Sequence, residues 1–285
     1  DQSILTKTYT EKAIKFIREN KSSPFFLHLC HAMPHKPLAA SEAFYTPETP
    51  DDLYADVIRE LDWSVSEVMN VLSDEGLLDN TIVIFMSDNG ASYGGNVTPL
   101  KGKKATNWEG GVRVHFMISY PEVLPSGTKV NIPCWSPDIF PTLLSLAEIE
   151  IPKEILLDGE NITEILRGNQ EDHKAIFTMS GNKINTIRKG NWKLFLEKPS
   201  FYKQIDIENW VDKRAPDGIS IIAPFEQATP AQYPGVRPEY IPGVRYLFNV
   251  SEDISEMKNQ YEDNSEIAIE LESIYYEFLE SLDKK

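Results

Sequence analysis

A carboxylate and an amide stand together where an apolar stretch of the chain ends. Asp88 and Asn89 follow the β-branched run 81–86 and precede Gly90, which permits a tight turn. Both side chains offer hard oxygen ligands, which suit Ca²⁺ or Mg²⁺ better than Zn²⁺. Such an ion takes about six or more oxygens, so the pair would be part of a site. Asp-Asn-Gly is also common turn chemistry, and a plain turn stays open as the alternative.

Two other segments carry groups that could contact an anion. His31 and His35 are four residues apart, but Pro34 and Pro37 prevent the helix that would align them for zinc. His35 could donate to a substrate oxygen or act as an acid, or be an ordinary surface histidine. Lys104 lies in the basic, glycine-containing loop 100–113 and could reach an oxyanion, with a solvated lysine cluster as the alternative.

The formal net charge is −16. This charge argues against nucleic acid as a partner and against broad attraction to anionic membranes. It leaves room for a small anionic substrate, because a few cations can dominate one pocket. Cys30 and Cys134 form neither a disulfide framework nor a zinc pattern, and we expect both to be buried. No apolar stretch approaches the roughly 20 residues of a membrane span.

Helices and strands alternate in the first half of the chain. Apolar spacing predicts helices over 9–20, 51–74 and 136–146, and buried strands over 25–30, 81–86 and 114–119. Apolar strands separated by helices indicate an α/β fold, a mostly parallel sheet with helices on both faces. The polar clusters after 25–30 and after 81–86 would then open on the same edge of the sheet.

The second half of the chain has a different pattern of predicted elements from the first. Short strands are predicted at 175–179, 185–189, 192–196 and 246–249, without helices between the first three. We expect a small antiparallel sheet, with the amphipathic helix 266–282 packed on it. The chain therefore divides into residues 1–165 and a small α+β subdomain, 166–285, with a Pro/Gly-rich insertion at 199–242.

Five motifs in one order together resemble the formylglycine-dependent sulfatase family of the alkaline-phosphatase-like superfamily. They are 34–38 (Pro-His-Lys-Pro-Leu), 81–90 ending in Ser-Asp-Asn-Gly, 104–113 with Trp-Glu-Gly-Gly-Val-Arg, 136–144, and 246–259. The sequence of residues 99–111 is most similar to that of arylsulfatase B-like members of the family. Residues 1–165 would be the C-terminal portion of the family's α/β domain.

The resemblance implies a role for each matching residue. Asp88 and Asn89 would bind Ca²⁺, with Mg²⁺ as the other candidate ion. His35 would contact the sulfate group or assist the leaving oxygen, and Lys104 would bind a sulfate oxygen. Glu109 and Arg113 would support the loop.

The family's nucleophile is a Cys or Ser within Cys/Ser-x-Pro-x-Arg, oxidised to formylglycine. Neither Cys30 nor Cys134 has that context. Asp51 and Asp52 are no substitute for the family's early metal-binding pair, since they begin a helix and are better interpreted as capping. We therefore expect the formylglycine nucleophile in an N-terminal segment that is missing here, so that this chain alone is inactive.

The function implied is hydrolysis of a sulfate ester, with an aryl or sugar sulfate, such as a glycosaminoglycan fragment, as substrate. One alternative is a phosphodiesterase or phosphonate hydrolase of the same superfamily, although Asn89 after Asp88 favours a sulfatase. The other is a non-catalytic pseudo-sulfatase that kept the fold for binding. By family habit the protein would be periplasmic, lysosomal or secreted.

Overall fold

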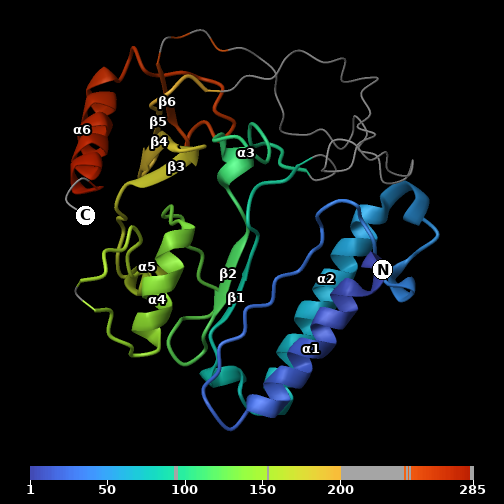
Figure 1. The fold of residues 1–285 in the computed structure, drawn as a ribbon. Coiled ribbons are helices and arrows are strands. Elements are labelled where there is room, and N and C mark those ends of the chain that lie inside the picture. The colour runs from blue at the N-terminus through green and yellow to red at the C-terminus, as the bar shows by residue number, and fades with distance from the viewer. Residues whose placement is uncertain (93–95, 153, 200–240, 242, 244, 283–285) are drawn as a thin grey trace.

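Two long helices lie side by side at the start of the chain (Figure 1). The computed structural model describes residues 1–92, 96–152, 154–199, 241, 243 and 245–282. After the short η1 (Gln2–Ile4) come α1 (Leu5–Asn20), η2 (Glu42–Phe44) and α2 (Thr49–Asp74). The helices predicted over 9–20 and 51–74 are confirmed, with α1 beginning four residues and α2 two residues earlier than expected.

The backbone of α2 is kinked near its start, at Asp52, which has non-helical φ and ψ angles of −146° and 55°. The carboxylate of Asp52 accepts a hydrogen bond from Ala55 N at 3.2 Å. A side-chain acceptor three residues ahead of the donor is the pattern of a helix N-cap. The capping interpretation of Asp52 is thereby confirmed.

Residues 25–30 do not form the strand that we predicted. The segment is extended and its side chains alternate, with Phe25 and Leu27 packed against Ile17 and Val71 and with Phe26 exposed. The apolar pattern therefore identified the extended backbone correctly. A strand also needs a hydrogen-bonded neighbour, and none of the described residues supplies one.

Both cysteines are exposed, contrary to the expectation that they are buried. Cys30 shares the outward side of the extended segment with Phe26 and His28, because alternate side chains of an extended chain point in opposite directions. Cys134 lies in the loop before η4 (Ser136–Asp138).

The central strands β1 (Val83–Met86) and β2 (Phe116–Ser119) confirm two predicted strands, but they pair antiparallel. We expected parallel neighbours in this part. The described residues of the connection 87–115 contain one helix, the four-residue α3 (Glu109–Val112), whereas the crossover between parallel strands is usually built on a longer helix. The chain instead loops back, so the end of β1 meets the start of β2.

Helices cover both faces of this ribbon (Figure 1). Val83 packs with the apolar cluster of α1 and α2, whereas Ile118 packs with Leu124 and Ile165 on the other side. That side carries α4 (Ile139–Leu146) and α5 (Thr163–Leu166); η3 (Leu78–Asn80) precedes β1. The α/β class is confirmed.

The C-terminal part is an antiparallel sheet of order β3-β4-β5-β6, formed by Ile176–Ser180, Lys183–Lys189, Trp192–Phe195 and Tyr246–Asn249. One face packs against α6 (Ser265–Leu282) through Leu194, Leu247 and Leu271. The predicted sheet and packed helix are confirmed. The proposed insertion 199–242 lies almost wholly outside the described residues.

Candidate active site

The loop after β1 places the Asp88–Asn89 pair. The antiparallel pairing continues for one bond beyond the strands, as Ser87 N donates to His115 O at 3.3 Å. The Ser87 hydroxyl then donates to Asn89 O at 3.1 Å, which turns the chain. Asp88 is exposed and Asn89 is half-buried. Both residues thus lie just beyond the end of β1, where they are accessible to a ligand.

Gly90 allows this loop to touch the α3 backbone. Gly90 N donates to Gly111 O at 2.9 Å. A Cβ atom at position 90 would lie 1.9 Å from Gly110 O. Any side chain at residue 90 would therefore push the loop carrying Asp88 and Asn89 away from α3.

Lys104 is tied to the same loop. Its backbone N donates to Ala91 O at 2.8 Å. The turn before α3 is closed by the Thr106 hydroxyl, which donates to Lys103 O at 2.7 Å. Lys104, Asp88 and Asn89 are consequently carried by two loops joined through backbone hydrogen bonds.

Glu109, the first residue of α3, anchors these loops to the C-terminal sheet. Its Oε1 lies 3.0 Å from Lys193 Nζ and its Oε2 lies 2.9 Å from Arg188 Nη1. Lys193 Nζ also lies 2.9 Å from Glu256 Oε1. Glu256 Oε2 accepts from Glu109 N at 2.6 Å. The supporting role expected for Glu109 is confirmed.

The two carboxylates of this network differ in their electrostatics. Burial disfavours the charge on Glu109, but the charges of Lys193 and Arg188 outweigh it and hold the pKa of Glu109 below its ordinary value. Burial, followed by the negative charge of Glu109, raises the pKa of Glu256 despite its contact with Lys193. The pKa values of the two carboxylates are therefore shifted in opposite directions.

Trp108 fixes the same loop by packing. It is 1% exposed and lies against Phe195 and Phe248, on the sheet face opposite α6. Its ring centroid is 4.6 Å from that of Phe195. Lys101 Nζ lies 4.2 Å from the Trp108 ring centroid, a cation–π contact. Figure 1 shows α3 between the central ribbon and the C-terminal sheet.

His35 occupies a separate loop. Pro34 and Pro37 both follow cis peptide bonds, and His35 N donates to Ala32 O at 3.2 Å. The exposed ring has its Nδ1 2.8 Å from Lys36 O. Among the described residues, no hydrogen bond joins His35 to Asp88, Asn89 or Lys104, so only the latter three are brought together by direct backbone contacts.

Sequence reasoning missed the residues that hold Glu109. Lys193 sits inside an apolar strand, and a charged residue at an inward position is the one local signal that could have drawn attention to it. Arg188 and Glu256 give no such signal. They lie far from Glu109 in the chain, and only the tertiary fold brings them to it.

The chain belongs to the sulfatase family. The sulfatase family model matches residues 2–149, just over half of the 285 residues. Human steryl-sulfatase is 33% identical over 215 residues, covering 69% of this chain and 37% of the relative. Human arylsulfatase D is 30% identical over 222 residues, covering 70% and 37%. N-acetylgalactosamine-6-sulfatase of Canis lupus familiaris is 32% identical over 197 residues, covering 66% and 38%.

Solved structures share the fold. The PsFucS1 sulfatase from Pseudoalteromonas sp. superposes with a TM-score of 0.73 at 20% identity, covering 99% of this chain and 54% of that one. Ps i-CgsB in complex with k-i-k-neocarrahexaose gives a TM-score of 0.73 at 24% identity, covering 96% and 54%. The chain spans under two fifths of the curated relatives named above and about half of these structures. No described helix is long and apolar enough to cross a membrane.

Proposed function

We propose that this chain carries the metal-binding and sulfate-binding part of a sulfate ester hydrolase. The observation that carries the proposal is the backbone connection between the Asp88–Asn89 loop and the Lys104 loop. In a sulfatase, two loops joined in this way could present two oxygen ligands and a cation to one sulfate group at the same end of the β1–β2 ribbon. Lys104 would attract a sulfate oxygen, and His35 would contact the sulfate or the leaving oxygen.

The donor set fits calcium, with magnesium as the other candidate. One exposed carboxylate and one half-buried amide supply two hard oxygens, fewer than the six to eight that calcium takes. Asp88 and Asn89 would therefore hold the ion together with other ligands. A bound ion would neutralise negative charge on the sulfate oxygens.

The substrate proposed is a sulfated sugar or an aryl sulfate. Two structural neighbours were solved with sugars, k-i-k-neocarrahexaose in one and D-glucosamine-2-N,6-O-disulfate in the other. No residue of this chain has the Cys/Ser-x-Pro-x-Arg context, so the proposal assigns the formylglycine nucleophile to a longer gene product. A lysosomal, periplasmic or secreted location accompanies this proposal by family habit.

A phosphonate monoester or phosphodiester hydrolase is the second candidate. Phosphonate monoester hydrolase SpPMH from Silicibacter pomeroyi shares the fold with a TM-score of 0.58 at 16% identity. The shared fold leaves the transferred group open, whereas Asn89 after Asp88 favours sulfate. A parallel assay with an aryl phosphonate separates the two.

The test measures sulfate release from a chromogenic aryl sulfate, with calcium, by the complete gene product and by this chain. We expect activity in the complete product, none in this chain, and loss of activity on chelation. Lys104→Met and Asp88→Ala should each lower kcat/KM at least a hundredfold, on the order of 3 kcal/mol. The exposed Lys129→Met is the control. Activity of the isolated chain would contradict the proposal. A complete gene product that is inactive both on the aryl sulfate and on sulfated sugars would favour a pseudo-sulfatase.

A further inference from the structure

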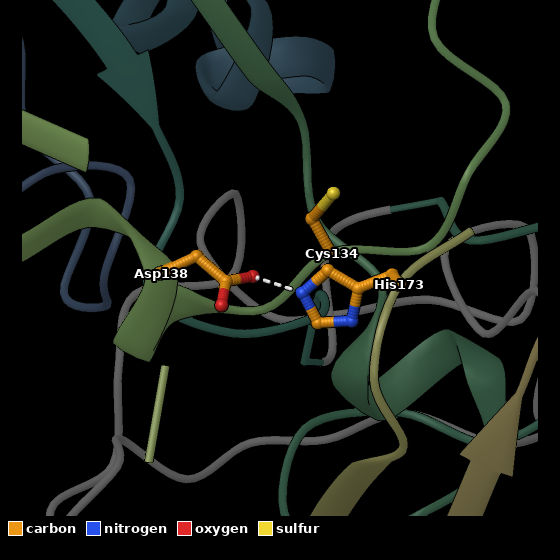
Figure 2. Close-up of side chains that lie close together, drawn as sticks. All are labelled: Cys134, Asp138 and His173. Carbon is orange, nitrogen blue, oxygen red and sulfur yellow. Dashed lines mark hydrogen bonds and ion pairs between the residues drawn. The ribbon is translucent and has the colours of Figure 1, made fainter. Parts of the chain in front are cut away.

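His173 lies where the two parts of the chain meet. It precedes β3, and its ring reaches back to Asp138 at the end of η4 and to Glu160 ahead of α5. Figure 2 shows the ring directed at the carboxylate of Asp138. The side chains of His173 and Asp138 are 2% and 0% exposed. Three segments of the chain therefore converge on one buried imidazole.

Both ring nitrogens of His173 face acceptors. Nδ1 lies 2.7 Å from Lys174 O, and a carbonyl has no proton to donate. Nε2 lies 2.9 Å from Asp138 Oδ2 and 3.3 Å from Glu160 Oε1. A neutral imidazole carries only one proton, so one nitrogen would present a lone pair to an acceptor. The geometry calls for a positive charge on the ring.

A metal ion could in principle supply that charge, since donor atoms of Cys134, Asp138 and His173 lie within 4.8 Å of one another. The contacts favour a proton. Both Asp138 oxygens already accept backbone bonds, from Trp135 N at Oδ2 and Glu160 N at Oδ1, each at 2.9 Å. The sulfur of Cys134 points away from the ring in Figure 2 and contacts Ile132 O at 3.6 Å.

We propose that His173 is a pH-sensitive latch: its imidazolium clamps Asp138 and Glu160, and loss of its proton loosens the junction between the α/β part and the C-terminal sheet. The latch also fixes backbone, because Lys174 N donates to Glu160 Oε1 at 2.8 Å and His173 N to Asp172 Oδ1 at 2.9 Å. Releasing the ring would therefore weaken bonds on both sides of the junction.

The charges around the ring are predominantly negative. Asp138, Glu160 and Asp172 face it or its backbone, while Lys174 Nζ, 75% exposed, lies 3.7 Å from Glu160 Oε2. Cys134 is a further titratable neighbour. Desolvation and the charges of Asp138 and Glu160 raise the pKa of its thiol to about 12, so it stays neutral.

The direction of the pH effect follows from the same contacts. Burial disfavours the charge on His173, but the hydrogen bonds to Asp138 and Lys174 O, with the carboxylate charges, outweigh burial and raise its pKa above 6.5. The stabilisation by the latch is fully present below the unfolded pKa of about 6.5 and is lost as pH rises through the higher folded pKa.

The first test is an NMR titration of the His173 ring in this chain, with the urea-unfolded chain as reference. We expect a folded midpoint above the unfolded one, with both nitrogens protonated at pH 6. Asp138→Asn and Glu160→Gln should move the midpoint down, whereas the exposed Glu197→Gln should leave it unchanged. A folded midpoint at or below the unfolded one overturns the latch.

The second test is backbone amide exchange at pH 6 and pH 8, corrected for intrinsic rates. Protection of the Glu160 and Lys174 amides should fall at pH 8 in the wild type. If the His173→Gln variant folds, the protection of these two amides should no longer change with pH. If the variant does not fold, the NMR titration of the wild type decides the question. Adding Zn²⁺ should leave the His173 resonances in place. A zinc-induced shift that Cys134→Ser abolishes and Cys30→Ser preserves would show a metal site and overturn the proposal.

Discussion

Lys193 of the C-terminal sheet places its Nζ 3.0 Å from Oε1 of Glu109, across 84 positions of the chain. Both side chains are buried, at 1% and 2% exposure. Glu109 begins the α3 turn, whose glycines contact the loop of the candidate metal ligands. This buried ion pair thereby helps to join the C-terminal sheet to the candidate active site, together with Arg188 and the packing of Trp108.

Replacing Lys193 by Met should destabilise the chain by about 3–5 kcal/mol, because it leaves Glu109 and Glu256 buried with their shared cation removed. Urea unfolding measures the change. Lys183→Met is the matched control, since this exposed lysine of β4 makes a surface contact with Glu197. The control should change stability by less than about 0.5 kcal/mol. Equal effects of the two substitutions would contradict the assigned role of Lys193.

Trp108→Ala should cost about 3–5 kcal/mol, since it opens a cavity between Phe195 and Phe248 and removes the ring beneath Lys101. Thermal or urea unfolding provides the measurement. Phe26→Ala serves as the aromatic control because Phe26 is 75% exposed. The interpretation is wrong if the unfolding free energy responds as little to Trp108→Ala as to the control.

Gly90→Ala should separate the two loops of the candidate site and cost about 1–3 kcal/mol, because the added Cβ meets the Gly110 carbonyl. The local readout is hydrogen exchange at the amides of residues 90 and 104, which bond to Gly111 O and Ala91 O. Both amides should lose protection. Gly181→Ala, in an open turn with no atom within 4 Å of the added Cβ, should leave that protection unchanged.

His31 should titrate in the opposite direction to His173. Its Nε2 lies 3.3 Å from Ser64 Oγ, and its buried Nδ1 has no hydrogen-bond partner among the described residues. Burial lowers the pKa of His31 and outweighs the opposing charge of Glu60. At His31 the folded state then binds fewer protons than the unfolded state, so the contribution of His31 to stability falls as pH drops below about 6.5.

The NMR midpoint of the His31 ring should accordingly lie below that of the unfolded chain. His31→Gln should flatten the loss of unfolding free energy between pH 7 and pH 5. A midpoint above the unfolded value would show that Glu60, rather than burial, dominates the environment of His31.

The sequence by itself determined the family, the α/β class and the C-terminal sheet with its helix. These features depend on local order: helical spacing in 51–74, the β-branched run 81–86, and motifs such as Ser-Asp-Asn-Gly at 87–90. Asp52 was also readable as a helix cap, because a cap and its donor lie within one turn. The local sequence pattern is sufficient to predict a structural feature where the interacting groups are close together in the chain.

Only the tertiary structure decided how distant groups pair. The antiparallel order of β1 and β2, the absence of a strand partner for segment 25–30 among the described residues, and the exposure of Cys30 all depend on which neighbour each segment meets. The Lys193–Glu109 pair and the His173 junction join residues tens of positions apart. Burial and electrostatics at such contacts are properties of the assembled neighbours, which is why neither could be predicted from residue type and spacing.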